Sequence, residues 1–234
     1  ICDLDISQFN LENACYTTLK RSLLIEFLRE KLFTNSVQFN KKIEQINCSN
    51  SRVEIVFEKN TTETFDYLVV ADGVFSSTKS ILINKDIKPK YFGSVALRAL
   101  VKKENLKFIN ENNISLFLGS NIHLVAYPIN TKNEINLIAI IRKNLDKKIL
   151  NNKNFFNLKD NIDELTSASL IQGNNDLQNI FRNTDDLKCF PIFTSNKIHQ
   201  VKQKNIFFLG DAFYVTPPTF AQGASQSIEA AFEL

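Results

Sequence analysis

The chain has 234 residues, of which 44% are hydrophobic, so it can bury a substantial core in one large domain or two small ones. Its 28 basic and 25 acidic residues leave a net charge of +3 with no basic block, which argues against a nucleic-acid partner. The four cysteines form no CxxC pair and no ligand spacing with histidine, so we expect no metal site, no disulfide framework and a reducing, cytoplasmic setting.

Two absences bear on what kind of chain this is. No apolar run is long enough to span a bilayer, so we expect no transmembrane segment. The sequence contains no methionine, and it stops at Leu234 inside a helical pattern, so we expect a piece of a longer protein.

The first part of the chain predicts a helix followed by short strands. Apolar residues at helical spacing predict an amphipathic helix within residues 16–32, with Thr17 or Thr18 available to cap it. Turn residues at 50–51 and 60–61 then separate short strands, which we expect to form a small antiparallel meander. These strands are predicted at 36–39, 42–49 and 52–59.

Two apolar runs, at 65–71 and 205–209, are typical of buried parallel strands, and each leads into a glycine and an aspartate. Asp72 and Gly73 follow the first run, and Gly210 and Asp211 follow the second. An aspartate at the carboxyl end of a parallel strand suits a ribose hydroxyl, because open α/β sheets bind their ligands at that edge. Glycine permits the tight turn and a close approach of the backbone to a ligand.

The second turn leads through a rigid loop into a helix. Pro218 is followed by Gln222, Gly223 and Ala224, and apolar residues at helical spacing predict a helix from Ser225. The backbone N–H groups near Gly223, at the start of this helix, suit an electron-rich acceptor.

Between the two turns the pattern changes to successive strands with short polar connections, which predicts a second, antiparallel sheet. The strands are predicted at 95–103, 114–119, 122–129 and 134–143, with a hairpin loop at 130–133. Helices are predicted at 162–171 and 177–182, and a strand at 188–193 then leads back to the last turn.

These motifs together resemble the FAD-dependent aromatic hydroxylases, the class A flavoprotein monooxygenases, in their salicylate-hydroxylase-like branch. Residues 72–79, DGVFSSTK, are similar to the family motif Asp-Gly-x-x-Ser-x-x-Arg, with Lys79 in place of the arginine. Gly210 and Asp211 match the family's Gly-Asp motif. Arg21, Leu24 and Leu28 match its Arg-x-x-Leu-x-x-x-Leu helix, although Arg21 could equally be a surface arginine.

The resemblance implies an FAD site. By this resemblance the cofactor-binding residues are Arg21, Asp72, Gly73, Gly210, Asp211, Pro218, Gln222, Gly223 and Ala224. The family usually reads Gly-Asp-Ala-Ala-His, whereas this chain has Phe213 and Tyr214 at the last two positions, and these larger side chains could crowd the turn. No GxGxxG loop is present, so we expect the first βαβ unit of the family's FAD-binding domain to be missing.

The resemblance also implies a substrate site on the inserted sheet. His123, Val125 and Tyr127 alternate along one strand, so their side chains point to the same face. Members of this branch that hydroxylate phenolic rings carry a histidine and a tyrosine here, so His123 is the predicted base, with Tyr127 beside it. Arg98, Tyr127 and Pro218 are the predicted substrate-binding residues. A hydrogen-bonded core histidine and a solvated sheet arginine are the alternatives for His123 and Arg98.

The implied activity is hydroxylation of a small aromatic, hydroxybenzoate-like or salicylate-like substrate with O2 and NADH or NADPH, through a flavin hydroperoxide. The alternatives are a related monooxygenase with a non-phenolic or quinone-precursor substrate, and a degenerate, non-catalytic module of the same fold. Whether the protein forms a homodimer is left open by the sequence.

The expected fold is α/β (α+β), a Rossmann-like FAD/NAD(P)-binding domain with an inserted antiparallel sheet, as in para-hydroxybenzoate hydroxylase. We predict that residues 1–90 and 196–234 belong to the FAD-binding domain and that residues 91–195 form the substrate domain.

Overall fold

A computed structural model describes residues 4, 5, 7, 18–33, 36–49, 51–106, 109–110, 113–129, 133–151, 181, 184 and 187–234. The chain divides into two compact units, one of Ile1–Phe33 with Val95–Phe190 and one of Thr34–Ser94 with Pro191–Leu234. The domain boundaries predicted from the sequence stay a prediction. The predicted hairpin loop at 130–133, apart from Asn133, and the predicted helices at 162–171 and 177–182, apart from Phe181, lie outside the described residues.

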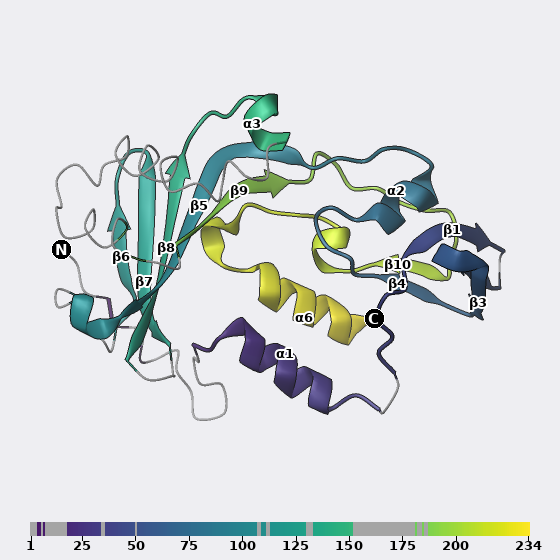
Figure 1. Cartoon of the computed structure of the whole chain (residues 1–234), viewed down its shortest axis with the longest axis horizontal. Helices are drawn as coiled ribbons and strands as arrows, with labels where there is room; N and C mark the ends of the chain where they lie inside the picture. Colours follow the sequence, from purple (N-terminus) through teal and green to yellow (C-terminus); the bar gives the residue numbers. More distant parts are fainter. Residues whose placement is uncertain are drawn as a thin grey trace. The chain divides into compact units, whose positions relative to one another are not determined.

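A five-stranded sheet of order β6-β7-β8-β5-β9 dominates the first unit (Figure 1). Its strands are β5 (Lys90–Lys102), β6 (Ser115–Leu118), β7 (Ile122–Ile129), β8 (Glu134–Arg142) and β9 (Lys188–Thr194). The β6/β7 and β7/β8 pairs are antiparallel, which confirms the predicted antiparallel sheet. Strand β5 begins at Lys90, earlier than predicted, because Gly93, with φ +88, lies inside the strand and does not end it.

One face of this sheet forms the larger hydrophobic core. Alternate residues of three strands are buried there, because side chains two apart share a face. Examples are Leu97 on β5, Leu124 on β7 and Leu137 on β8, each 0–2% exposed. The residues between them therefore lie on the opposite face, which carries the predicted substrate residues.

The second unit contains an antiparallel meander of β1 (Ile43–Cys48), β2 (Val53–Phe57) and β3 (Thr61–Phe65). The meander was predicted, but its strands differ from the prediction. Residues 36–39 form no strand, and the third strand is β3, whose sequence TTETF carries no continuous apolar pattern. Pairing with β2 therefore sets this strand more than its own residues do.

Strand β4 (Leu68–Val70) pairs in parallel with β10 (Ile206–Phe208), as the two apolar runs predicted. Strand β4 is shorter than the predicted run 65–71, because Phe65 ends β3 and Ala71 begins the turn. A smaller core of Val53, Ile55, Phe57, Val70, Ile206 and Ala212 joins this pair to the meander. The carboxyl ends of both parallel strands consequently lie at one edge.

The described part of the chain also contains helices. They are α1 (Arg21–Glu30), α2 (Ser77–Ile83), α3 (Lys147–Asn151) and α6 (Gly223–Glu233), with short 3-10 turns η2 (Glu58–Asn60), η3 (Lys103–Asn105), η6 (Gly210–Ala212) and η7 (Pro218–Phe220). Helix α6 starts earlier than predicted, at Gly223. No helix in the described part of the chain is long and apolar enough to cross a membrane.

Candidate functional site

The turn after β4 leads directly into α2. Gly73 has a φ of +85, which a residue with a side chain adopts only under strain, and its C=O accepts the Ser76 N–H at 3.1 Å. The Ser76 hydroxyl then caps α2 by accepting the Lys79 N–H at 3.0 Å, while Asp72 Oδ2 accepts the Thr78 N–H at 3.1 Å. The spacing of the DGVFSSTK motif therefore has a local structural reason.

The Asp72 carboxylate combines this capping role with exposure to solvent. A carboxylate offers about four lone-pair positions, so one hydrogen bond from α2 leaves room for a ligand hydroxyl. Loop capping and ribose binding, which the sequence presented as alternatives, are thus compatible at Asp72.

Lys79 occupies the position of the family's arginine and is 5% exposed. Burial lowers the pKa of its amine, and the negative charge of Asp72 partly opposes that shift. The amine also lies 5.9 Å from the centroid of the Phe208 ring, within the range of a cation–π contact. Lys79 therefore links α2 to β10 from inside the unit.

The turn after β10 lies against α6. Gly210 has a φ of +56, and a Cβ placed on it would lie 2.8 Å from Ser227 Oγ of α6. Its C=O accepts the N–H groups of Phe213 and Tyr214 at 2.9 and 3.1 Å. Glycine is thus required here both for the backbone conformation and for the approach of the helix.

The start of α6 has polar groups available for a ligand. Gln222 stands at the N-cap, and its side chain caps no backbone N–H of the helix but accepts from Gln226 Nε2 at 3.4 Å. The Ser225 hydroxyl instead donates to the Gln222 C=O at 3.0 Å, and Ser227 donates to the Gly223 C=O at 2.7 Å. The first N–H groups of α6, from Gly223 and Ala224, therefore suit an acceptor outside the helix.

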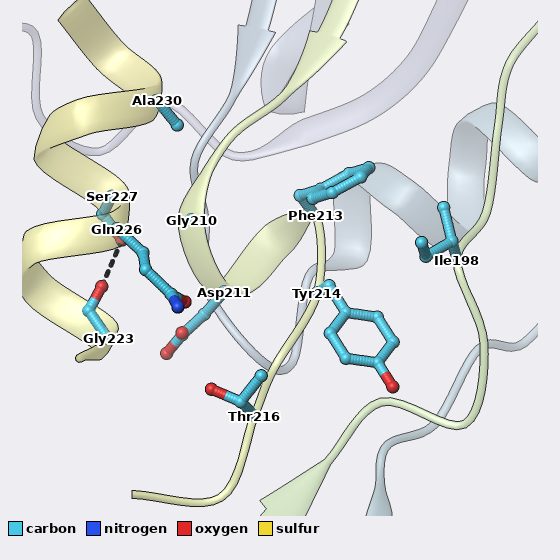
Figure 2. Close-up of a pocket in the computed structure, with 10 residues that line it drawn as sticks. All are labelled: Ile198, Gly210, Asp211, Phe213, Tyr214, Thr216, Gly223, Gln226, Ser227 and Ala230. Carbon is cyan, nitrogen blue, oxygen red and sulfur yellow. Dashed lines mark hydrogen bonds between the residues drawn. The ribbon is translucent and has the colours of Figure 1, made fainter. Parts of the chain in front are cut away.

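The turn after β10 and the start of α6 border a hollow of about 230 Å³ (Figure 2). It is lined by Ile198, Gly210, Asp211, Phe213, Tyr214, Thr216, Gly223, Gln226, Ser227 and Ala230. Whole ligand pockets span roughly 300–1,000 Å³, so this hollow suits only part of a large cofactor. Figure 2 shows the side chains of Asp211 and Gln226 pointing toward each other.

Phe213 and Tyr214, the departures from the family motif, both line the hollow. Their side chains are 43% and 39% exposed. In Figure 2 both rings lie on one side of the Gly210 turn, with α6 on the other. The rings therefore do not separate Asp211 from the start of α6.

The predicted substrate residues share one face of the five-stranded sheet. Leu124 and Ala126 of β7 face the core, so His123 and Tyr127, both half-buried, face the other way. On β5, Leu97 and Ala99 face the core, which places the exposed Arg98 on this second face as well. His123, Tyr127 and Arg98 thus form a set on one face.

Two contacts tie the segment before α1 to the end of the β7/β8 pair. Thr18 Oγ1 donates to the Pro128 C=O at 2.6 Å, and Lys20 Nζ lies 2.6 Å from Glu134 Oε2. Arg21 follows Lys20 directly and is exposed. Arg21 therefore starts a helix that is anchored beside the strand carrying His123 and Tyr127.

The structure brings together some of the predicted residues. Gly210, Asp211 and Gly223 line one hollow, and Asp72 with Gly73 lies at the same edge of the parallel pair. Pro218, Gln222 and Ala224 flank the hollow in sequence without lining it. The described residues contain no group of three histidine, cysteine or acidic side chains that could hold a metal ion.

Sequence reasoning missed two residues of interest. Ser227 lies against Gly210, and only the fold could reveal this, since a serine in a helix gives no signal of its own. Asn136 lies buried on β8 within the apolar run INLIAII. A single amide inside such a run was a signal available from the sequence.

Comparison with known proteins relates the whole chain to one group of enzymes. A 3-amino-4-hydroxybenzoate 2-monooxygenase, PtnB3, of Streptomyces platensis is 24% identical over 223 residues, covering 94% of this chain and 54% of that protein. A salicylate hydroxylase of Pseudomonas putida is 25% identical over 145 residues, covering 56% of this chain and 33% of that protein. No family model matches the chain.

The structural comparison agrees. A variant of HpxO from Klebsiella pneumoniae, in complex with FAD, superimposes with a TM-score of 0.74 at 19% identity, covering 91% of this chain and 54% of that one. The chain is related to the FAD-dependent aromatic monooxygenases, and its fold is theirs. This confirms the predicted para-hydroxybenzoate-hydroxylase-like fold. The chain spans about half the length of PtnB3 and of HpxO.

Proposed function

We propose that the protein carrying this chain is an FAD-dependent monooxygenase that hydroxylates a small aromatic substrate of the hydroxybenzoate or salicylate kind. The observation that carries the proposal is the pair of glycine and aspartate turns at one edge of the parallel strands β4 and β10. The start of α6 lies against the second turn, so hydroxyl-binding carboxylates and free backbone N–H groups gather at this edge.

The residues of this edge fit parts of FAD. Asp72 and Asp211 are both exposed acceptors suited to ribose and ribityl hydroxyl groups. The N–H groups of Gly223 and Ala224 suit an electron-rich edge of the flavin ring, with Gln222 and Pro218 beside them. When bound, FAD takes electrons from NADH or NADPH and activates O2 for insertion into an aromatic ring.

On the sheet, His123 would remove the phenolic proton of the substrate and make the ring more electron-rich. Its half-buried place supports this role, because a base needs both access to the substrate and a partly water-free setting. Tyr127 and Arg98 would orient the substrate, with the Arg98 guanidinium suited to a carboxylate. Arg21, on the helix anchored next to this sheet, would contact the cofactor.

A second function rests on the aromatic residues at the hollow. Phe213 and Tyr214 line it where the family has a small residue and a histidine, and the buried Lys79 stands in place of the family's arginine. These changes favour a degenerate module that has lost flavin binding. A related monooxygenase with a non-phenolic substrate is the other candidate, in which His123 has no role as a base.

One experiment separates these functions. The complete protein is purified and its absorbance recorded for bound flavin, and NADH and NADPH oxidation is then measured with and without a panel of hydroxybenzoates. Bound FAD, substrate-stimulated oxidation and a hydroxylated product support the proposal. Colourless protein that FAD cannot reconstitute contradicts it and favours the degenerate module.

Replacing the base tests the substrate class. We expect His123→Ala to lower turnover of phenolic substrates by about 10²-fold or more while flavin binding is unchanged. His199→Ala is the matched control, since His199 lies in the other unit and has no proposed role in catalysis. Unchanged turnover in His123→Ala would favour a substrate without a phenolic proton.

A further inference from the structure

Asn136 interrupts the apolar strand β8 with a buried amide. The residue is 8% exposed, and its Nδ2 has no hydrogen-bond partner among the residues that the structure describes. An unpaired buried donor is uncommon, because it gives up its hydrogen bonds to water without replacing them. A leucine of similar size would avoid that loss, so the amide at this position calls for a functional reason.

The register of the sheet places this amide in the proposed substrate site. Asn136 is directly opposite Tyr127 in the antiparallel β7/β8 pair, and Ile140 is opposite His123. Opposite residues project from the same face with Cβ atoms about 4.5–5.5 Å apart. The neighbours Ile135 and Leu137 face the core, which confirms that Asn136 faces the side of Tyr127.

We propose that Asn136 is a substrate-binding residue whose side-chain N–H donates a hydrogen bond to an exocyclic oxygen of the aromatic substrate. The inference rests on the proposed function and deepens it, since it adds a specificity-determining group to the sheet face. The half-buried Tyr127 ring next to it can change rotamer when a substrate enters, and this uncovers the amide. The donor then gains the partner that it lacks in the free chain.

A buried donor of this kind selects for substrates that carry an acceptor. A ligand without the oxygen leaves the amide unpaired and binds more weakly than one that pairs with it. The substrates favoured by this site are therefore aromatic rings with a carboxylate or hydroxyl oxygen that reaches β8.

The test compares Asn136→Leu and Asn136→Asp in the complete protein with FAD bound. Binding of 2-hydroxybenzoate, benzoate and phenol is titrated by the change in the flavin spectrum. We expect Asn136→Leu to raise the Kd by about tenfold for the ligands that carry the contacted oxygen. The Kd should stay unchanged for the one that lacks it, which is phenol if a carboxylate oxygen is contacted and benzoate if the hydroxyl is contacted. Asn136→Asp adds an acceptor where a donor is needed, so its loss should be larger.

The melting temperature separates substrate binding from a purely structural role. Because Asn136→Leu removes an unpaired polar group, the variant without substrate should melt at or above the wild-type temperature if Asn136 serves substrate binding. A structural role would instead lower the melting temperature. Asn144→Leu, at an exposed position just after β8, is the control and should change neither property. A lower melting temperature with an equal loss for all three ligands overturns the inference, as does a Kd unchanged for every ligand.

The failure of the proposed function gives a separate signature. Wild-type protein that binds neither flavin nor any of the three ligands refutes the proposed function and this inference with it. Wild-type protein that binds them while Asn136→Leu behaves identically refutes the inference alone.

Discussion

Replacing Gly210 with alanine tests whether the turn after β10 must lie against α6. The residue has a φ of +56, a left-handed conformation that costs alanine about 1 kcal/mol more than glycine. The new Cβ would also lie 2.8 Å from Ser227 Oγ, whose hydroxyl donates to the Gly223 C=O at 2.7 Å. Moving that hydroxyl away loses a hydrogen bond of about 1 kcal/mol, so the total loss of folding free energy is about 2 kcal/mol.

Gly73 provides the matched control. Its φ is +85, and a Cβ there would meet nothing within 4 Å, so Gly73→Ala should cost only the backbone strain of about 1 kcal/mol. Measured in the Ser227→Ala background, relative to Ser227→Ala alone, Gly210→Ala should cost only this same amount, because the hydroxyl and its hydrogen bond are absent from both proteins. Both losses are measured by chemical denaturation of the flavin-free protein.

The same variants report on the cofactor. In Gly210→Ala the added methyl group crowds the contact between α6 and the turn that carries Asp211, so FAD should bind at least several-fold more weakly than it does to the Ser227→Ala double variant. Equal losses of stability in Gly210→Ala and Gly73→Ala would refute the reasoning, because the contact with Ser227 would then have no energetic effect.

Three further results are expected. Asp211→Asn should weaken FAD binding about tenfold, while Asp86→Asn, which removes an exposed carboxylate paired with Lys88, should not; equal affinities would remove Asp211 from the site. Burial raises the pKa of the Cys189 thiol to about 12, so peptide-level labelling of native protein with N-ethylmaleimide should modify Cys48 much faster, and the reverse order would contradict the structure. Burial, then the positive charges of nearby lysines, lower the pKa of His199 from 6.5, so its contribution to stability is present above pH 6.5 and declines as the pH falls below it; the melting temperature of His199→Gln should fall less between pH 7 and 5 than that of the wild type.

Local sequence patterns determined much of this fold. The apolar runs before Asp72 and Gly210 predicted parallel strands, because strands buried on both faces read as near-continuous apolar runs; the parallel pairing is confirmed, while Val69 of β4 is 43% exposed. Alternation along residues 122–129 placed His123 and Tyr127 on one face, because the period of a strand is set by its backbone geometry. The motif around Gly73 and Ser76 also has a local explanation, because Gly73 adopts a positive φ and the Ser76 hydroxyl caps the following helix.

Tertiary structure decided what these patterns leave open. The polar strand Thr61–Phe65 forms because β2 offers its hydrogen-bonding edge, and the residues of β3 do not by themselves predict this pairing. Gly210 meets Ser227 through a contact between two segments whose separate sequences contain no sign of each other. The sequence by itself thus determined the elements and the aspartates, histidine and tyrosine that they carry. Packing alone decided that the side chains of Lys79 and Asn136 are buried from solvent, because burial depends on every element that packs around a side chain.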